Sequence, residues 1–262
     1  TFSMSALTLE AKGEANAHTK ALDEIRDQVK PVASGFAIDD SKSEALKEKY
    51  SWKRVYFIRH GQGEHNVAGA KSETGCDCKK VADRSARQCP YIDPLLTDPL
   101  LTDLGKEQAI SLQPQVINKP ISLVIVSPLR RALGTAQLVF AKNNLNIVCV
   151  ENCRERIGSH YCDQRFSIEK QKECFPHIDF SQIKDNHDSL WSEDIESGLS
   201  VAKRACQVIS DLKHVDDENL AIVAHSSFLL TTCNLAIKMQ DEKLSHWFAT
   251  GELRVIDIIF DQ

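Results

Sequence analysis

The stretch "RVYFIRHG", residues 54–61, joins a buried strand to a cluster of polar side chains at its end. Four apolar or aromatic residues run directly into Arg59, His60 and Gly61. A strand that is apolar on both faces is typical of a sheet covered by helices on each side. In open α/β sheets, ligands bind beyond the carboxyl ends of the strands. An arginine and a histidine at this point therefore predict a binding or catalytic site.

Similar apolar runs recur along the chain and alternate with amphipathic segments. This alternation is the pattern of repeated βαβ units around a parallel sheet. The sequence therefore predicts an α/β protein with three layers, α/β/α, and a mostly parallel central sheet. The predicted strands are residues 54–58, 121–126, 146–150, 220–224 and 254–260, and the predicted helices are residues 104–116, 129–141, 198–213 and 228–238.

The first 50 residues are polar and helical in character, with proline and glycine interrupting them at "PVASGFAIDD". We interpret residues 1–50 as an N-terminal helical arm or extension, which packs on the domain, exchanges with a second copy in a homodimer, or frays. Residues 51–262 are predicted to form one enzyme-sized domain with a long insertion around residues 70–103. Loops this long are usually functional or inserted, so we expect selectivity to come from the insertion and from residues 156–190.

Composition argues against two classes of partner. The net charge of −5 provides no basic field for gripping nucleic acid. No apolar run approaches the ~20 residues that span a bilayer, and the first thirty residues lack the order of a secretory signal. We therefore expect a cytoplasmic protein that binds neither nucleic acid nor membrane.

The nine cysteines are odd in number and spread along the chain, which makes a poor disulfide framework and suggests reduced thiols. Two groups of cysteine and histidine invite comparison with zinc sites, but neither has paired C-x-x-C spacing. We therefore expect ordinary buried or surface thiols, no metal and no cofactor. The two groups are Cys76, Cys78 and Cys89, and Cys153, His160, Cys162, Cys174 and His177.

The side chains that follow the predicted strands suit phosphate chemistry. Arg59 and His60 follow the first strand, and Arg131 lies in the helix after the second. His225 follows the fourth strand. Arginine forks match the acceptor oxygens of a phosphate monoester in a way that lysine does not. Fixed donors aimed at the equatorial oxygens lower the barrier to phosphoryl transfer, and Arg59, Arg131 and His225 can supply them.

His60 is the candidate nucleophile, because a neutral imidazole nitrogen can attack phosphorus and form a phosphohistidine. Nearby arginines should lower the histidine pKa and keep the ring neutral. The leaving alkoxide needs a proton, for which Glu155 is the candidate donor and Glu151 and Glu64 are alternatives. Gly61 lets the backbone approach a phosphate closely, and the side-chain amide of Asn66 can donate a hydrogen bond to it.

Four motifs in this order resemble those of the histidine phosphatase superfamily, the phosphoglycerate mutase-like enzymes. The first contains the Arg-His-Gly signature, and the fourth contains the second histidine. The resemblance covers roughly residues 54–260, and four ordered motifs are far more specific than one. The motifs are "FIRHGQGEHN" (57–66), "LTDLGKEQA" (101–109), "SPLRRALGTA" (127–136) and "IVAHSSFL" (222–229).

Carried over position by position, the resemblance implies a phosphoglycerate mutase-like fold with His60 as the phosphorylated nucleophile. It implies that Arg59, Arg131 and His225 form the phosphate pocket. Glu155 falls on the acid of the mutase branch.

The substrate-binding positions implied by the resemblance include two departures from the family pattern. Asn66 falls on the family's asparagine, whereas Gln62 stands where a glutamate is common and Ser226 where a glycine is common. The acid-phosphatase branch has an aspartate at the position of Ser226, so the chain resembles the mutase-like branch. Within it, the chain most resembles a phosphoglycerate mutase-like subgroup of plants, fungi and protists.

The predicted function is hydrolysis of a phosphomonoester, with a small phosphorylated metabolite as the substrate. The lid sequence of glycolytic mutases is not evident, which favours hydrolysis over isomerisation. Two alternatives stay open: a phosphoglycerate-type phosphomutase, and a catalytically idle protein that senses or binds a phosphate ligand.

Overall fold

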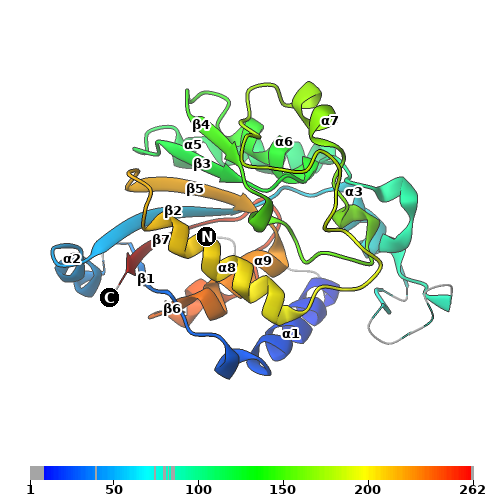
Figure 1. Ribbon diagram of the computed structural model, residues 1–262, viewed down its shortest axis with the longest axis horizontal. Helices are drawn as coiled ribbons and strands as arrows, with labels where there is room; N and C mark the ends of the chain where they lie inside the picture. The colour runs from blue at the N-terminus through cyan, green and yellow to red at the C-terminus, as the bar shows by residue number, and fades with distance from the viewer. Residues whose placement is uncertain are drawn as a thin grey trace.

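The computed structural model describes residues 9–38, 40–73, 75–78, 81, 83 and 86–260, and a seven-stranded sheet lies at the centre of this described part (Figure 1). The strand order is β4-β3-β5-β2-β7-β1-β6. Strand β7 runs antiparallel to both of its neighbours, and the other pairings are parallel. The predicted mostly parallel sheet is confirmed. The strands are β1 (Ala33–Ala37), β2 (Ser51–Arg59), β3 (Leu123–Val126), β4 (Asn146–Cys149), β5 (Asn219–Ala224), β6 (Ile237–Met239) and β7 (Leu253–Phe260).

Helices cover both faces of the sheet, and the alternation of side chains along β2 shows why. Val55 and Phe57 are fully buried in one core cluster together with residues of α8 and α9. Tyr56 and Ile58 point the other way into a second cluster with residues of α4 and α6. Each such buried side chain contributes about 1.5–3 kcal/mol to folding. The helices are α1 (Leu9–Asp23), α2 (Ser41–Lys47), α3 (Glu64–Lys71), α4 (Asp103–Ser111), α5 (Gln113–Val116), α6 (Arg130–Val139), α7 (Ile168–Cys174), α8 (Gly198–Leu212) and α9 (Ser226–Thr231).

The predicted helix 228–238 is wrong at its C-terminal end. Helix α9 passes into a π-helical turn over Thr232–Ala236, and the chain then enters strand β6. The hydroxyls of Thr231 and Thr232 each donate to the carbonyl four residues earlier, a contact that competes with regular helix geometry. The apolar pattern alone did not distinguish this ending from a longer helix.

The predicted N-terminal arm contributes to the sheet and to the helical layer. Strand β1 lies between β7 and β6, so this part of residues 1–50 is an inner strand. Helix α1 packs on the domain, where Leu22 shares a buried cluster with Leu230 and Trp247. The division into an arm and a domain stays a prediction.

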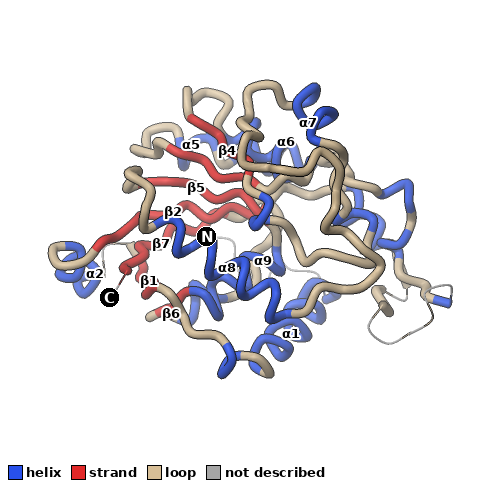
Figure 2. Tube along the Cα trace, in the orientation of Figure 1, coloured by secondary structure: helices blue, strands red, loops and turns tan. Residues whose placement is uncertain are grey.

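Long loops gather at the carboxyl edge of the parallel strands (Figure 2). Asp98 connects its own loop to the start of α6, to the loop before α7 and to α7 itself. Its carboxylate accepts hydrogen bonds from the backbone amides of Arg130 and Phe166 and from the side-chain amide of Gln171. Arg154 is fully buried and forms an ion pair with Asp188. These buried polar contacts fix the loops that surround the ends of β2, β3 and β5.

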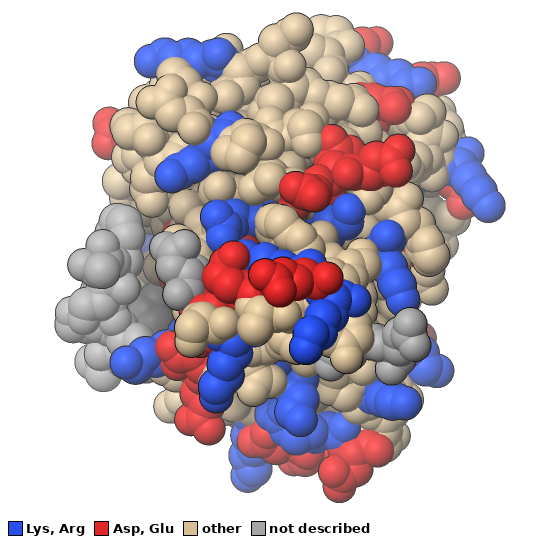
Figure 3. Space-filling model, turned by 90° about the vertical axis from the view of Figure 1, so that its left-hand side faces the viewer, with Lys and Arg blue, Asp and Glu red and all other residues tan. Residues whose placement is uncertain are grey.

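Basic and acidic side chains are interspersed on the face shown in Figure 3, without a broad area of one sign. Among the described residues, no helix combines the length and the apolar character needed to cross a membrane.

Candidate active site

Strands β2 and β5 are adjacent and parallel, and their register brings the two motif histidines together. Arg59 pairs with Ala224, so His60 and His225 are the next residue on each strand. Their ring centroids are 5.0 Å apart, and both side chains are buried. The two histidines, 165 positions apart in the sequence, therefore face a common site.

The His60 ring is held in one tautomer. Its Nδ1 lies 2.7 Å from the carbonyl oxygen of Gly61. Because a carbonyl can only accept, Nδ1 carries the proton and Nε2 keeps its lone pair. Burial, followed by the charges of Arg131 and Arg59, holds the His60 pKa well below its usual value of 6.5. The ring is therefore neutral at pH 7, as the sequence predicted.

His225 is neutral for similar reasons, since burial and then the charge of Arg131 hold its pKa well below the usual value. Its Nε2 lies 2.7 Å from the hydroxyl of Ser127. Its Nδ1 is buried without a hydrogen-bond partner among the described residues. A ligand oxygen that reached this nitrogen would satisfy it.

Arg131 lies beside His60, with its Nε 3.3 Å from His60 Nε2. Its terminal nitrogens donate to the Cys162 carbonyl at 2.6 Å and to the Asp163 carboxylate at 2.7 Å. These contacts fix the plane of a guanidinium that is only 1% exposed. Arg59 donates to the Phe248 carbonyl at 2.7 Å and is also buried.

Glu155 lies next to the second histidine. One carboxylate oxygen accepts from the Ser226 hydroxyl at 3.2 Å and from the Ser227 amide at 3.1 Å. The two alternative carboxylates have surroundings that differ from those of Glu155. Glu151 forms ion pairs with Arg154 and Arg165, and Glu64 is exposed at the start of α3.

The second motif supports the turn after His60, because its residues share one face of helix α4. Thr102 donates to the Gln62 side chain at 2.8 Å, and Gln108 accepts from the Gln62 amide at 2.8 Å. A Cβ on Gly61 would lie 2.2 Å from the Gly105 carbonyl oxygen, so only glycine fits where turn and helix meet. The side chain of Gln62 is thus part of the support for the turn.

The third motif reaches the site through several of its residues. Ser127 contacts His225, and Arg131 contacts His60. The Thr135 hydroxyl accepts from the Gly61 amide at 3.0 Å. Thr135 and Ser127 were not predicted as site residues, although both lie in the quoted motif. Each lies four residues from Arg131, one before it and one after it, and this spacing is the signal that identifies them.

Asn66 lies one turn into α3, where its side-chain oxygen accepts from the Gly63 amide at 2.9 Å and caps the helix. His65, which was not predicted, is buried with its ring 5.7 Å from that of His60. Burial, then the charge of Arg131, holds the His65 pKa well below its usual value. His65 Nδ1 has no hydrogen-bond partner among the described residues.

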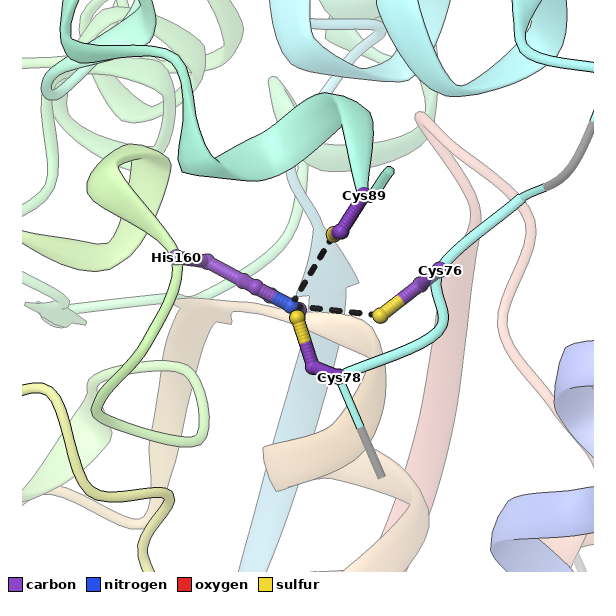
Figure 4. A group of neighbouring side chains, drawn as sticks. All are labelled: Cys76, Cys78, Cys89 and His160. Atoms are coloured by element: carbon purple, nitrogen blue, oxygen red, sulfur yellow. Dashed lines mark hydrogen bonds between the residues drawn. The ribbon is translucent and has the colours of Figure 1, made fainter. Parts of the chain in front are cut away.

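A second group of potential metal-ligating side chains lies outside this cluster. Cys76, Cys78, Cys89 and His160 place their potential ligand atoms within 4.8 Å of one another. Figure 4 shows the four side chains pointing toward a common centre. The two sequence groups that invited comparison with zinc sites thus contribute to one cluster, because His160 of the second group joins the three cysteines of the first. The expectation of ordinary thiols without a metal stays a prediction.

Comparison with known proteins identifies the family of this chain. The model of the histidine phosphatase superfamily, branch 1, matches residues 95–261. Phosphoglycerate mutase-like protein 1 of Arabidopsis thaliana is 32% identical over 247 residues, covering 79% of this chain and 81% of that protein. A protein named as a candidate phosphoserine phosphatase 2 of Hydrogenobacter thermophilus is 27% identical over 179 residues, covering 68% and 75%.

The fold also matches a solved structure. A candidate alpha-ribazole-5'-P phosphatase of Escherichia coli superimposes with a TM-score of 0.50 and 22% identity, covering 78% of this chain and 89% of that one. Likeness at this identity concerns the fold alone. From the family match and the Arabidopsis relative, we conclude that the chain belongs to the histidine phosphatase superfamily, branch 1.

Proposed function

We propose that the protein hydrolyses a phosphomonoester of a small metabolite through a covalent phosphohistidine on His60. The observation that carries this proposal is the state of the His60 ring. Its Nδ1 is fixed against the Gly61 carbonyl, and its neutral Nε2 lies 3.3 Å from Arg131 Nε and close to the His225 ring. A nucleophile and cationic donors are thus arranged around the same point.

In the first step, the Nε2 lone pair of His60 attacks phosphorus while the bond to the ester oxygen breaks. Arg59, Arg131 and neutral His225 donate to the equatorial oxygens, where charge is spread in the transition state. A phosphate oxygen takes the place of His60 Nε2 as the acceptor for Arg131. The buried Nδ1 of His225 gains the partner that it lacks.

Glu155 moves the proton in both steps. Its protonated carboxyl donates to the leaving alkoxide, and the resulting carboxylate takes a proton from the attacking water. The water oxygen then bonds to phosphorus as the bond to His60 Nε2 breaks, which releases inorganic phosphate. The contacts of Glu155 with Ser226 and Ser227 support this role, because they hold the carboxylate beside His225.

The phosphoenzyme provides the test. Mixing the protein with a 32P-labelled aryl phosphate and quenching in base should trap one phosphoryl group on His60, since phosphohistidine survives base. His60→Ala should not be labelled, and its kcat should be lower by a factor of at least about 10³. Hydrolysis that persists in His60→Ala would refute the mechanism.

A panel of phosphorylated metabolites, assayed by phosphate release, identifies the substrate class. We expect hydrolysis without a bisphosphate primer. Turnover that requires such a primer and returns an isomerised monophosphate would instead establish the mutase reaction. An intact protein that binds phosphate but hydrolyses nothing in the panel would favour the sensing alternative.

A further inference from the structure

The cluster of Cys76, Cys78, Cys89 and His160 has the donor set and spacing of a metal site. Cys76 Sγ and Cys89 Sγ lie 3.4 and 3.7 Å from His160 Nε2. Zinc bonds of ~2.3 Å to sulfur and ~2.0–2.1 Å to nitrogen, at tetrahedral angles, place a sulfur and a nitrogen ligand about 3.6 Å apart. The two observed separations lie on either side of that value.

From this geometry we infer that Cys76, Cys78, Cys89 and His160 bind one Zn²⁺ ion in a structural site. Three thiolates and one imidazole make a Cys₃His set, which closes a tetrahedral site without an open position for catalysis. Ligand atoms that all lie within 4.8 Å leave room for one ion between them. Soft thiolate ligands select zinc over magnesium or calcium.

The surroundings of His160 fit a metal ligand. Its Nε2 faces the sulfurs, and its Nδ1 on the far side of the ring lies 3.7 Å from a carboxylate oxygen of Asp163. Histidines that bind zinc generally direct their other nitrogen toward a carboxylate or carbonyl, which fixes the tautomer and the ring. The Tyr91 ring packs 5.0 Å from the His160 ring.

A second group, His160, Cys162 and Asp163, also brings three potential ligand atoms within 4.8 Å. It offers only three ligands, and Asp163 already forms an ion pair with Arg131. The four-residue group is therefore the better site.

The ion would join two segments that are distant in the sequence and lie near the candidate active site. Three ligands come from the insertion around residues 70–103, and His160 comes from the loop after β4. Asp163 connects the site inward, because its other oxygen accepts from Arg131, whose Nε lies beside His60. Zinc would thus hold the insertion against the loop that positions Arg131. Asp163 is a positioning residue in this arrangement.

Metal content of the full chain, isolated without chelator, tests the inference independently of any phosphatase assay. We expect about one zinc per chain by mass spectrometry of the elements. The zinc content of Cys89→Ser should fall to background. Cys174→Ser, which replaces an exposed thiol outside the group, should retain the metal. Equal zinc in both variants would overturn the assignment.

Cobalt binding provides a second test. It does not require the replacement of a buried cysteine, so a failure of such a variant to fold cannot affect the result. Co²⁺ added to the reduced, metal-depleted full chain should give thiolate-to-cobalt charge transfer and the visible bands of a tetrahedral site. Cys76 is exposed, so Cys76→Ser should cost little packing and lower the charge-transfer intensity by about one third, in proportion to the thiolates lost. A protein that contains no zinc and gives no such band, or one in which Cys76 is disulfide-bonded to Cys89, would disprove the site.

Discussion

At the residue scale, the position of Glu155 gives a test that separates proton donation from phosphate binding. Glu155→Gln keeps the shape of the side chain and its acceptor oxygen but removes the transferable proton. We expect kcat to fall about 10²–10⁴-fold on an alkyl phosphate, whose leaving group needs protonation. On an aryl phosphate with an acidic phenol the loss of phosphoenzyme formation should be much smaller, because the leaving group departs without a proton.

The comparison is made by single-turnover kinetics on both substrates. Glu64→Gln, which changes an exposed carboxylate at the start of α3, is the matched control and should leave both rates unchanged. An equal loss on both substrates would show that Glu155 acts in positioning or binding, and not as the acid.

Individual residues of the site were predictable when a motif placed them at the end of a strand. His60 and His225 are an example, because adjacent parallel strands end at one edge. His65 was missed, since its burial against His60 depends on how α3 turns back over the site. The contact of Asp163 with Arg131 depends on a long loop, which has no periodic signal. Sequence spacing did not identify the cluster around His160, because 70 residues lie between Cys89 and His160.

At the scale of elements, the contact between the turn after β2 and helix α4 limits both stability and catalysis. A Cβ on Gly105 would lie 2.1 Å from the Gln62 carbonyl oxygen. To relieve this clash, the backbone that carries His60 would have to move. Gly105→Ala should therefore lower the free energy of unfolding by about 1–3 kcal/mol and reduce kcat as well. Urea unfolding and steady-state kinetics measure the two effects.

Gly134 in the interior of α6 is the matched control. A Cβ there would meet Leu101 at 3.4 Å, an ordinary contact, and alanine favours a helix interior by about 1 kcal/mol over glycine. Gly134→Ala should therefore be neutral or stabilising. If Gly105→Ala were equally harmless, the tight contact would not constrain the turn.

Strands with a long run of apolar residues were predicted from the sequence, whereas strands with a short or weak run were not. The predicted strands that became β2, β3, β4, β5 and β7 are confirmed, because each is a continuous apolar run. Strand β1, "ASGFA", has small residues and a glycine that packs against Met239, so its sequence carries little strand signal. Strand β6 is three residues long and is visible only through its pairing with β1.

At the scale of the whole molecule, three neutral histidines make stability depend on pH. Burial, as the largest cause, lowers the pKa of His60, His65 and His225 well below 6.5 in the folded protein. Below that pH the unfolded chain binds protons that the folded protein excludes, so acid favours unfolding. Each histidine contributes a slope of up to about 1.4 kcal/mol per pH unit, or about 4 kcal/mol for three.

Other groups do not reverse this trend between pH 6.5 and 5. Burial raises the pKa of Asp98 to about 6, so the folded protein takes up one proton there and gains stability as the pH falls. His160 also opposes the trend, mainly near and above pH 6.5, where the unfolded histidine loses its proton. Burial lowers its pKa, but hydrogen bonds to Asp163 and to two cysteines together outweigh burial and raise the pKa to about 11. One carboxyl and one histidine thus oppose three histidines. Asp188 and Asp257 have folded pKa values below 3.8, so the stability that they contribute is lost only in stronger acid.

Urea unfolding at pH 7.5, 6.5, 5.5 and 5.0 measures the slope directly. His65→Met removes one buried neutral histidine and leaves the identities of the residues proposed for phosphoryl transfer unchanged. Its stability should fall less steeply with acid than that of the unmodified chain, by up to about 1.4 kcal/mol per pH unit. Release of a metal in acid would affect both proteins alike, so the difference between their slopes isolates the histidine. Parallel slopes would mean that His65 titrates normally in the folded state, contrary to its burial beside Arg131 and His60.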